Sequence, residues 1–439
     1  MQTYCRIALA ANLFLVFSGS LAQTGAEPMP VLRASDVLPE NLLKGPHHRV
    51  NEEVRSDGYL NYYTIESDFG TFEAQSNLML AVRVRELRAL AELERVSSSE
   101  AFAGAAIEAG LSPARAVVHI AQHPVSTVTG IPAGIGRLFK RYSRAGKEGV
   151  SSAGDLVAGS PCKELQDDAE RSDCEEREQE RQHAQSLYER YFKISDAQRR
   201  WHEKLGTDPY TSNDVLHEAV KRVAWADRLG RFSIGFAGIP SIPGADYVAD
   251  ATKIVWGKDP YELRDYNVEV LQEAGLDEAT IEAFFDNPWF SPTMQTTLIA
   301  AIESLPGVAG RQYVLLAAIN TDSEAEARFV LQSVVAMTWY NTERSPINEF
   351  ADDIHFPVAS TAAGHLLVIL PVDYLVWTEE MAGLARAAAR QHQGDTDSRA
   401  ARELWLFGGV SSRAKREIER LGWTVLDQQR EVIRASGTN

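Results

Sequence analysis

Five side chains suited to acid–base or metal chemistry lie close together in the last quarter of the chain. They are Asp352, Asp353, His355, His365 and Asp373. They border two apolar segments, residues 354–359 and 365–370, whose composition predicts strands. Carboxylates and imidazoles at strand ends can hold a metal ion or share a general acid–base step. Side chains alternate between the two faces of a strand, so all five cannot meet. This cluster is the candidate catalytic site, and it favours a hydrolase if the protein is an enzyme.

A second pair of possible metal ligands is His119 and His123, on the helix predicted to begin at Ser112 and Pro113. A spacing of four residues places both imidazoles on one helix face, which is half of a metal site. No Asp or Glu occurs between residues 111 and 147, so further ligands would come from distant segments. We therefore favour ordinary packing or surface placement, and we predict no metal and no other cofactor.

Ser412 and Lys415 have the S-x-x-K spacing of enzymes in which lysine activates a serine nucleophile. The K-[ST]-G motif that accompanies it in such enzymes does not follow. The chain also lacks the sharp motifs of zinc, nucleotide, calcium and α/β-hydrolase sites. We interpret Ser411 or Ser412 as a helix cap and Lys415 as a solvated side chain.

The first 22 residues have the layout of a secretory signal peptide. Arg6 precedes a neutral, mostly apolar run over residues 7–17, and Ser20-Leu21-Ala22 fits the small-x-small pattern of a cleavage site. The run is too short to cross a bilayer, which takes about 20 apolar residues. We expect an exported protein, periplasmic or extracellular, without a transmembrane segment once the signal is cleaved.

Signal cleavage leaves two cysteines, Cys162 and Cys174. An even pair in an exported protein predicts a disulfide. The charge-rich residues 163–181 resemble a solvated helix, but one continuous helix would separate the two Cα atoms by about 18 Å, and a disulfide tolerates at most about 7 Å. We therefore expect the chain to reverse near residues 167–172. A zinc site that adds His183 is the less favoured alternative, because no fourth ligand is evident.

The net charge of the 439-residue chain is −17. Nucleic acids and anionic membranes are bound through surplus Lys and Arg, so this balance argues against both as partners. The protein or envelope component that the chain binds is not indicated by its composition.

The first third of the chain is predicted to contain few strands. After the signal, residues 23–56 form an irregular leader rich in Pro and polar residues. Residues 57–150 hold a β-hairpin, built from strands at residues 59–65 and 71–75, followed by helices, the first capped by Asn77. Residues 151–181 form a charged linker that contains both cysteines.

The remainder is predicted to be a helical domain followed by a small α/β subdomain. Residues 182–345 read as helices that begin at Asn213, at Asp259-Pro260, at Ser291-Pro292 and at Asp322-Ser323. Residues 346–430 contain a βαβ unit, with strands at residues 404–407 and 423–426 around a helix at residues 411–421. Residues 431–439 are a tail. The predicted fold class is mainly α, with a short N-terminal hairpin and this subdomain.

Three functions are compatible with these features. A non-catalytic envelope or secreted protein that binds a partner is favoured, because no convincing catalytic motif occurs. A hydrolase that uses the Asp/His cluster is the first alternative. The second is a membrane-active protein that uses the two Gly-Ile-Pro segments at residues 130–132 and 238–240.

Overall fold

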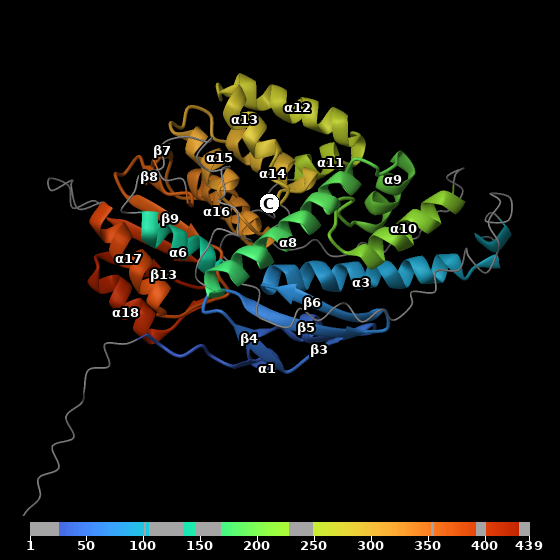
Figure 1. Cartoon of the computed structure of the whole chain (residues 1–439), viewed down its shortest axis with the longest axis horizontal. Coiled ribbons are helices and arrows are strands. Elements are labelled where there is room, and N and C mark those ends of the chain that lie inside the picture. Colours follow the sequence, from blue (N-terminus) through green and yellow to red (C-terminus); the bar gives the residue numbers. More distant parts are fainter. Residues whose placement is uncertain are drawn as a thin grey trace, which may run out of the picture.

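The computed structural model describes residues 26–100, 102–104, 135–145, 168–227, 249–352, 355–391 and 401–429. Within these ranges the chain forms an N-terminal antiparallel sheet, a body of helices and a C-terminal mixed sheet, which lie against one another (Figure 1). The predicted signal peptide (residues 1–22) and tail (residues 431–439) lie outside the described ranges. None of the described helices has an 18-residue stretch apolar enough to span a bilayer.

The N-terminal sheet has six strands with β5 at its centre. β5 pairs with β6 on one side and with β3 and β4 on the other, always antiparallel. The β5–β6 hairpin predicted from residues 59–75 is therefore confirmed as part of a larger sheet. The elements are β1 (Leu32–Arg33), α1 (Ala34–Val37), α2 (Glu40–Leu43), β2 (Lys44–Gly45), β3 (His48–Val50), β4 (Glu53–Ser56), β5 (Asn61–Ser67) and β6 (Gly70–Gln75).

The prediction of an irregular leader over residues 23–56 is wrong from residue 32 onward. Buried and exposed residues alternate along β3 and β4, and Val50 and Val54 enter the core. Strands of two to four residues offer too few positions for this alternation to stand out in the sequence. They are held in place because β5 supplies their hydrogen-bonding partner.

Helix α3 (Asn77–Ser97) packs on one face of this sheet through Leu80, Leu87 and Leu90, which share a core with strand residues. Its cap is Ser76, whose Oγ accepts a hydrogen bond from the Met79 N–H at 3.2 Å, so the predicted cap at Asn77 is wrong by one residue. Ser76 has a φ of 90°, a conformation that is strained for any residue with a Cβ. This strained residue connects the end of β6 to the start of α3.

The helical body runs from α8 to α16. The predicted starts are confirmed, because Asn213, Asp259, Ser291 and Ser323 each accept N–H hydrogen bonds as N-caps. The helices are α8 (Asp168–Tyr191), α9 (Asp196–Leu205), α10 (Asp214–Ala226), α11 (Ala249–Gly257), α12 (Pro260–Glu273), α13 (Glu278–Phe285), α14 (Pro292–Glu303), α15 (Arg311–Ile319) and α16 (Glu324–Glu343). A separate helix, α6 (Gly136–Ala145), lies against the C-terminal part.

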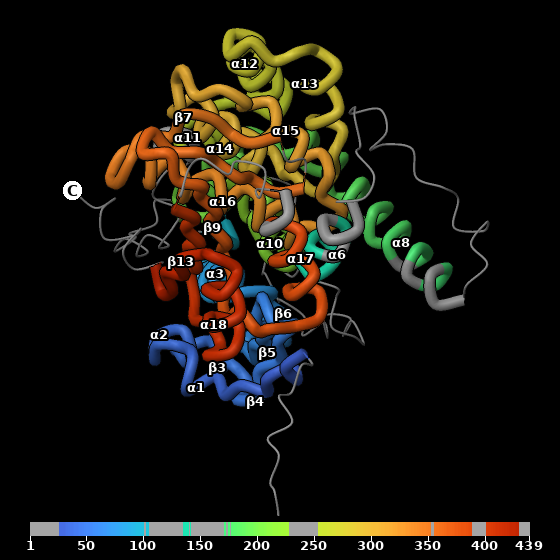
Figure 2. The backbone as a smooth tube through the Cα atoms, turned by 90° about the vertical axis from the view of Figure 1, so that its left-hand side faces the viewer, coloured from blue at the N-terminus to red at the C-terminus, as the bar shows by residue number. Residues whose placement is uncertain are grey.

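Helix α8 corrects the prediction of a charged linker over residues 151–181, because residues 168–181 belong to this helix. Opposite charges three or four residues apart stabilise such a helix without an apolar stripe. Figure 2 shows α8 projecting from the body. Residues 168–172 are helical and do not reverse the chain as expected. Cys174 lies on α8, and Cys162 lies outside the described residues, so their disulfide stays a prediction.

The C-terminal sheet has the order β13-β11-β9-β8-β7. β9, β11 and β13 are parallel, and the predicted parallel pair of the βαβ unit is confirmed, with Leu404 opposite Val425. A two-stranded sheet of β10 and β12 accompanies it. The elements are β7 (Ile347–Phe350), β8 (Ala359–Thr361), β9 (Leu366–Leu370), β10 (Tyr374–Leu375), α17 (Glu379–Gln391), β11 (Arg402–Leu406), β12 (Gly409–Val410), α18 (Ser412–Arg420) and β13 (Trp423–Leu426).

The strand predicted over residues 354–359 is wrong for residues 355–358, which are irregular, whereas Ala359 begins β8. The strands in this part of the chain are β7 and β8, which pair antiparallel with each other. Pro357 lies between them, and proline has no N–H to donate to a ladder. The chain is rich in helix, but its two large sheets, of six and five strands, make the β part more extensive than the predicted hairpin and small subdomain.

Candidate functional site

Two described members of the predicted Asp/His cluster, His365 and Asp373, are not brought together. His365 precedes β9 and Asp373 follows it, and a five-residue strand separates its ends by about 17 Å. His365 Nδ1 lies 3.0 Å from Glu403 Oε1 on the neighbouring strand. Asp352 is exposed, and His355 is half-buried. Asp353 lies outside the described residues.

Asp373 connects the C-terminal part of the fold to the N-terminal sheet and to α3. Its carboxylate accepts hydrogen bonds from the backbone N–H of Asn61 at 3.0 Å and of Asn77 at 3.0 and 3.1 Å. A carboxylate at the first residue of α3 is also favourably placed against the helix dipole. This residue therefore fixes the N-terminal sheet against the C-terminal part of the fold.

The other sequence candidates have structural roles or lie outside the described ranges. Ser411 Oγ caps α18 by accepting the Ala414 N–H, as predicted, and Lys415 Nζ lies 3.2 Å from Asp427. His119 and His123 are not among the described residues. Within the described part of the chain, no three His, Cys, Asp or Glu side chains are grouped as a metal site would require.

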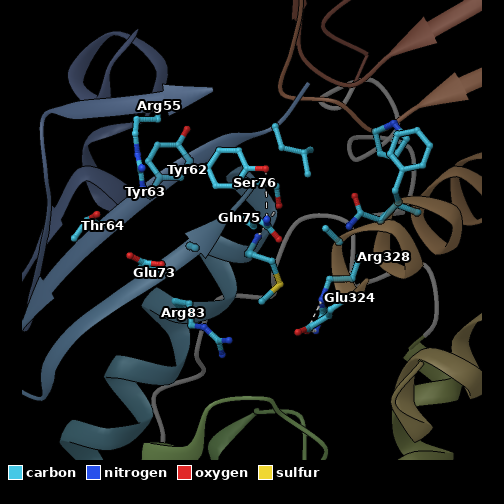
Figure 3. Close-up of a pocket in the computed structure, with 17 residues that line it drawn as sticks. Arg55, Tyr62, Tyr63, Thr64, Glu73, Gln75, Ser76, Arg83, Glu324 and Arg328 are labelled. Atoms are coloured by element: carbon cyan, nitrogen blue, oxygen red, sulfur yellow. Dashed lines mark hydrogen bonds and ion pairs between the residues drawn. The ribbon is translucent and has the colours of Figure 1, made fainter. Parts of the chain in front are cut away.

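A different site is a cavity of about 340 Å³ between the N-terminal sheet and the start of α16, which we call the sheet–α16 cleft. Strands β4, β5 and β6 form one wall, and the first turns of α3 and α16 form the others (Figure 3). Apolar side chains such as Leu60, Met79 and Phe329 alternate with polar ones. The charged lining residues are Arg55, Glu73, Arg83, Glu324 and Arg328.

Three of these charges form the floor of the cleft. Arg328 donates from Nε and Nη2 to Glu324 Oε1 at 2.9 and 2.6 Å. Ser212 Oγ donates to the same oxygen at 3.4 Å and accepts from Arg83 Nη2 at 3.0 Å. The chain Arg83–Ser212–Glu324–Arg328 thus connects α3, the loop before α10, and α16.

The guanidinium of Arg83 pairs with a buried carboxylate, that of Glu86. Its Nη1 lies 2.7 Å from Glu86 Oε2, and Glu86 is 2% exposed. Glu86 also accepts hydrogen bonds from Thr211 Oγ1 and Asn213 Nδ2. A buried carboxylate that is paired and hydrogen-bonded in this way holds its guanidinium partner in one orientation.

The floor keeps Glu324 ionised. Burial opposes its charge, but Arg328 and then Arg83 outweigh burial and lower the pKa of Glu324 below its ordinary value. With Glu86 counted, two cations and two carboxylates are present here, so the charges of the floor balance.

A smaller chamber of about 120 Å³ lies on the other side of this floor. It shares Glu324 and Arg328 with the cleft, and its walls are aromatic, with Tyr191, Tyr210 and Trp289. Burial raises the pKa of Tyr191 and of Tyr210, so both hydroxyls stay protonated and able to donate. The ion pair between Glu324 and Arg328 therefore lines both cavities.

On the sheet wall, Tyr62 is held in place by two neighbours. Its hydroxyl donates to Asp57 Oδ2 at 2.9 Å and accepts from Gln75 Nε2 at 3.4 Å. Burial raises the pKa of Asp57 even though the Leu60 N–H, the Tyr62 hydroxyl and the Tyr59 N–H donate to it. The two hydrogen bonds of the Tyr62 hydroxyl fix the position of its ring, which lines the cleft.

None of the cleft residues was a sequence candidate, because they come from segments between residues 55 and 371. One signal was present: Arg83 follows Leu80 by three residues and precedes Leu87 by four, so it lies on the apolar face of α3. A charge at such a position must find a buried partner. Here the partner is Glu86.

Comparisons with protein-family models, with curated protein sequences and with solved structures found no match to this chain.

Proposed function

We propose that this is an exported, non-catalytic binding protein and that the sheet–α16 cleft holds its ligand. The observation that carries the proposal is a cavity of about 340 Å³ whose charged floor is assembled from three separate segments. Ligand sites commonly lie where structural units meet, with mixed apolar and polar walls. The cleft has both properties.

The site supports binding because its polar groups are already fixed. Arg83, Glu324 and Arg328 are held by one another and by Ser212, and the Tyr62 hydroxyl is held by Asp57 and Gln75. A preformed site loses less conformational entropy when a ligand enters. Among the described lining residues of the cleft there is no imidazole, and Ser76 Oγ is engaged as the cap of α3.

The hydrolase alternative is less well supported, because it needs the Asp/His cluster to converge and β9 separates His365 from Asp373. The membrane-active alternative depends on residues 130–132 and 238–240, which lie outside the described ranges. Export itself rests on residues 1–22, also outside these ranges.

The proposal is tested with a panel of probes against the full mature chain, using ligand-observed NMR. The panel contains neutral disaccharides, tripeptides, dicarboxylates and phosphate monoesters. We expect at least one class to bind, and Ala325→Trp and Gln332→Trp to abolish its binding, because each places an indole in the cleft from a lining position.

The matched control is Ala279→Trp, at an exposed position of α13, which should bind as the wild type does. Melting temperatures within about 3 °C of the wild type establish that the variants are folded. Absence of binding by every class, or unchanged binding by both blocked variants, would overturn the assignment of this cleft.

A further inference from the structure

Two of the five charged side chains that line the cleft have no ionic partner among the described residues. Arg83, Glu324 and Arg328 have ionic partners, whereas the side chains of Arg55 and Glu73 make no hydrogen bond or ion pair within the described part of the chain. They do not pair with each other either. A cation and an anion therefore face the same cavity without a counter-charge from any described residue.

The strand register places these two charges on one face of the sheet. Arg55 on β4 is opposite Tyr62 on β5, Tyr62 is opposite Gln75 on β6, and Thr64 is opposite Glu73. Residues two apart along a strand share a face, so Arg55, Tyr62 and Glu73 point the same way. Ordinary strand spacings put the Cα atoms of Arg55 and Glu73 about 12 Å apart.

The surface between the two charges carries no unpaired charge. It consists of the Tyr62 ring, with its hydroxyl already engaged, and Thr64. The opposite wall contributes the apolar side chain of Phe329 and the neutral amide of Gln332. A ligand that reached both charges would therefore need an uncharged middle with backbone-like polarity.

We propose that the ligand is a short zwitterionic peptide that lies across β4, β5 and β6, with its carboxylate at Arg55 and its ammonium at Glu73. This rests on the proposed function of the cleft. Three extended residues span about 10 Å, which is close to the separation of the Arg55 and Glu73 Cα atoms. A neutral sugar would leave both charges unpaired, and a ligand with charges of one sign would be repelled by one of them.

Calorimetry with tri-alanine, N-acetyl-tri-alanine and tri-alanine amide tests the two ends separately. We expect each blocking group to weaken binding to the wild type about fivefold, the effect of one partly exposed charge pair. In Glu73→Gln, acetylation should cause no further loss. In Arg55→Gln, amidation should cause none.

Matched controls are Arg49→Gln and Glu66→Gln, an exposed cross-strand pair of β3 and β5 outside the cleft lining, and both should bind tri-alanine as the wild type does. Blocking groups without effect, or losses that persist unchanged in the two cleft variants, would overturn the peptide assignment. If a sugar or a phosphate ester binds the cleft and tri-alanine does not, only this inference fails. If no probe binds, the proposed function fails as well.

Discussion

Two glutamates on the first turn of α16, only two residues apart, have opposite electrostatic outcomes. Glu324 faces the cleft with a side chain that is 38% exposed, and Arg328 and Arg83 lower its pKa. Glu326 is fully buried and shares one guanidinium, that of Arg141 on α6, with Asp322. Burial raises the pKa of Glu326 to about 7.

The difference is in the number of counter-charges for each carboxylate. In the cleft floor two cations, Arg83 and Arg328, serve two carboxylates, Glu86 and Glu324. In the second cluster two carboxylates compete for Arg141 alone. Glu326 Oε1, Asp322 Oδ1 and Arg141 Nε are buried without a hydrogen-bond partner among the described residues. The cleft floor is thus a satisfied network, and the Arg141 cluster is an incompletely satisfied one. Satisfied networks are rigid, which is the property that a preformed site requires.

The largest effect is expected from removal of the single cation in the second cluster. Arg141→Met leaves Glu326 buried without a counter-charge, and breaking a buried pair in this way costs about 3–5 kcal/mol. Urea unfolding at pH 8 measures the loss. Arg49→Met, at an exposed position, is the control and should change the free energy of unfolding by less than about 0.5 kcal/mol.

A somewhat smaller loss, about 2–3 kcal/mol, is expected from Arg83→Met in the cleft floor. Glu86 would lose its ion pair but keep its hydrogen bonds from Thr211 and Asn213. The same urea titration compares it with Arg141→Met. A larger loss for Arg83→Met would contradict the distinction between the two clusters.

The pH dependence of stability should also separate the two glutamates. The pKa of Glu326 rises from 4.5 to about 7 on folding, so its contribution is fully present below pH 4.5 and is lost as the pH rises through 7. Glu326→Gln removes this titration, and its stability relative to the wild type should increase between pH 5 and 7 by on the order of 2 kcal/mol.

Glu324→Gln should show the opposite sign, because the pKa of Glu324 is lowered on folding. Its contribution is present at neutral pH and is lost as the pH falls through its folded pKa. Urea midpoints measured for both variants from pH 4 to 8 decide the matter. Parallel pH profiles for the two variants would show that the fold does not distinguish these carboxylates.

The smallest effect, about 1 kcal/mol, is expected from Ser212→Ala, because one hydroxyl bridge between Arg83 and Glu324 is lost. Ser304→Ala, which removes a hydroxyl bonded to the Ala301 carbonyl on α14, is the matched control for stability. If the floor orients the ligand, Ser212→Ala should weaken probe binding and Ser304→Ala should not. NMR titration of the two variants measures both affinities.

Predictions from the sequence were most accurate for features that depend on residues close together in the chain. Four helix starts were predicted because the capping side chain is within three residues of the N–H that it accepts. The βαβ unit was predicted because a helix with glycine after it and short apolar strands on either side has few alternatives. Nearness in sequence was misleading for His365 and Asp373, which are eight residues apart but are separated by an extended strand.

Four helix caps, the β5–β6 hairpin and the parallel pairing of the two strands around α18 were determined by the sequence alone, since a short stretch of chain decides each of them. Only the tertiary structure decided which charges are paired and where a cavity lies. Whether Glu324 is ionised, and whether Arg55 has a partner, depends on groups a few ångströms away in space that come from other segments of the chain. Coulomb energies and burial change steeply over such distances, and no local pattern encodes them.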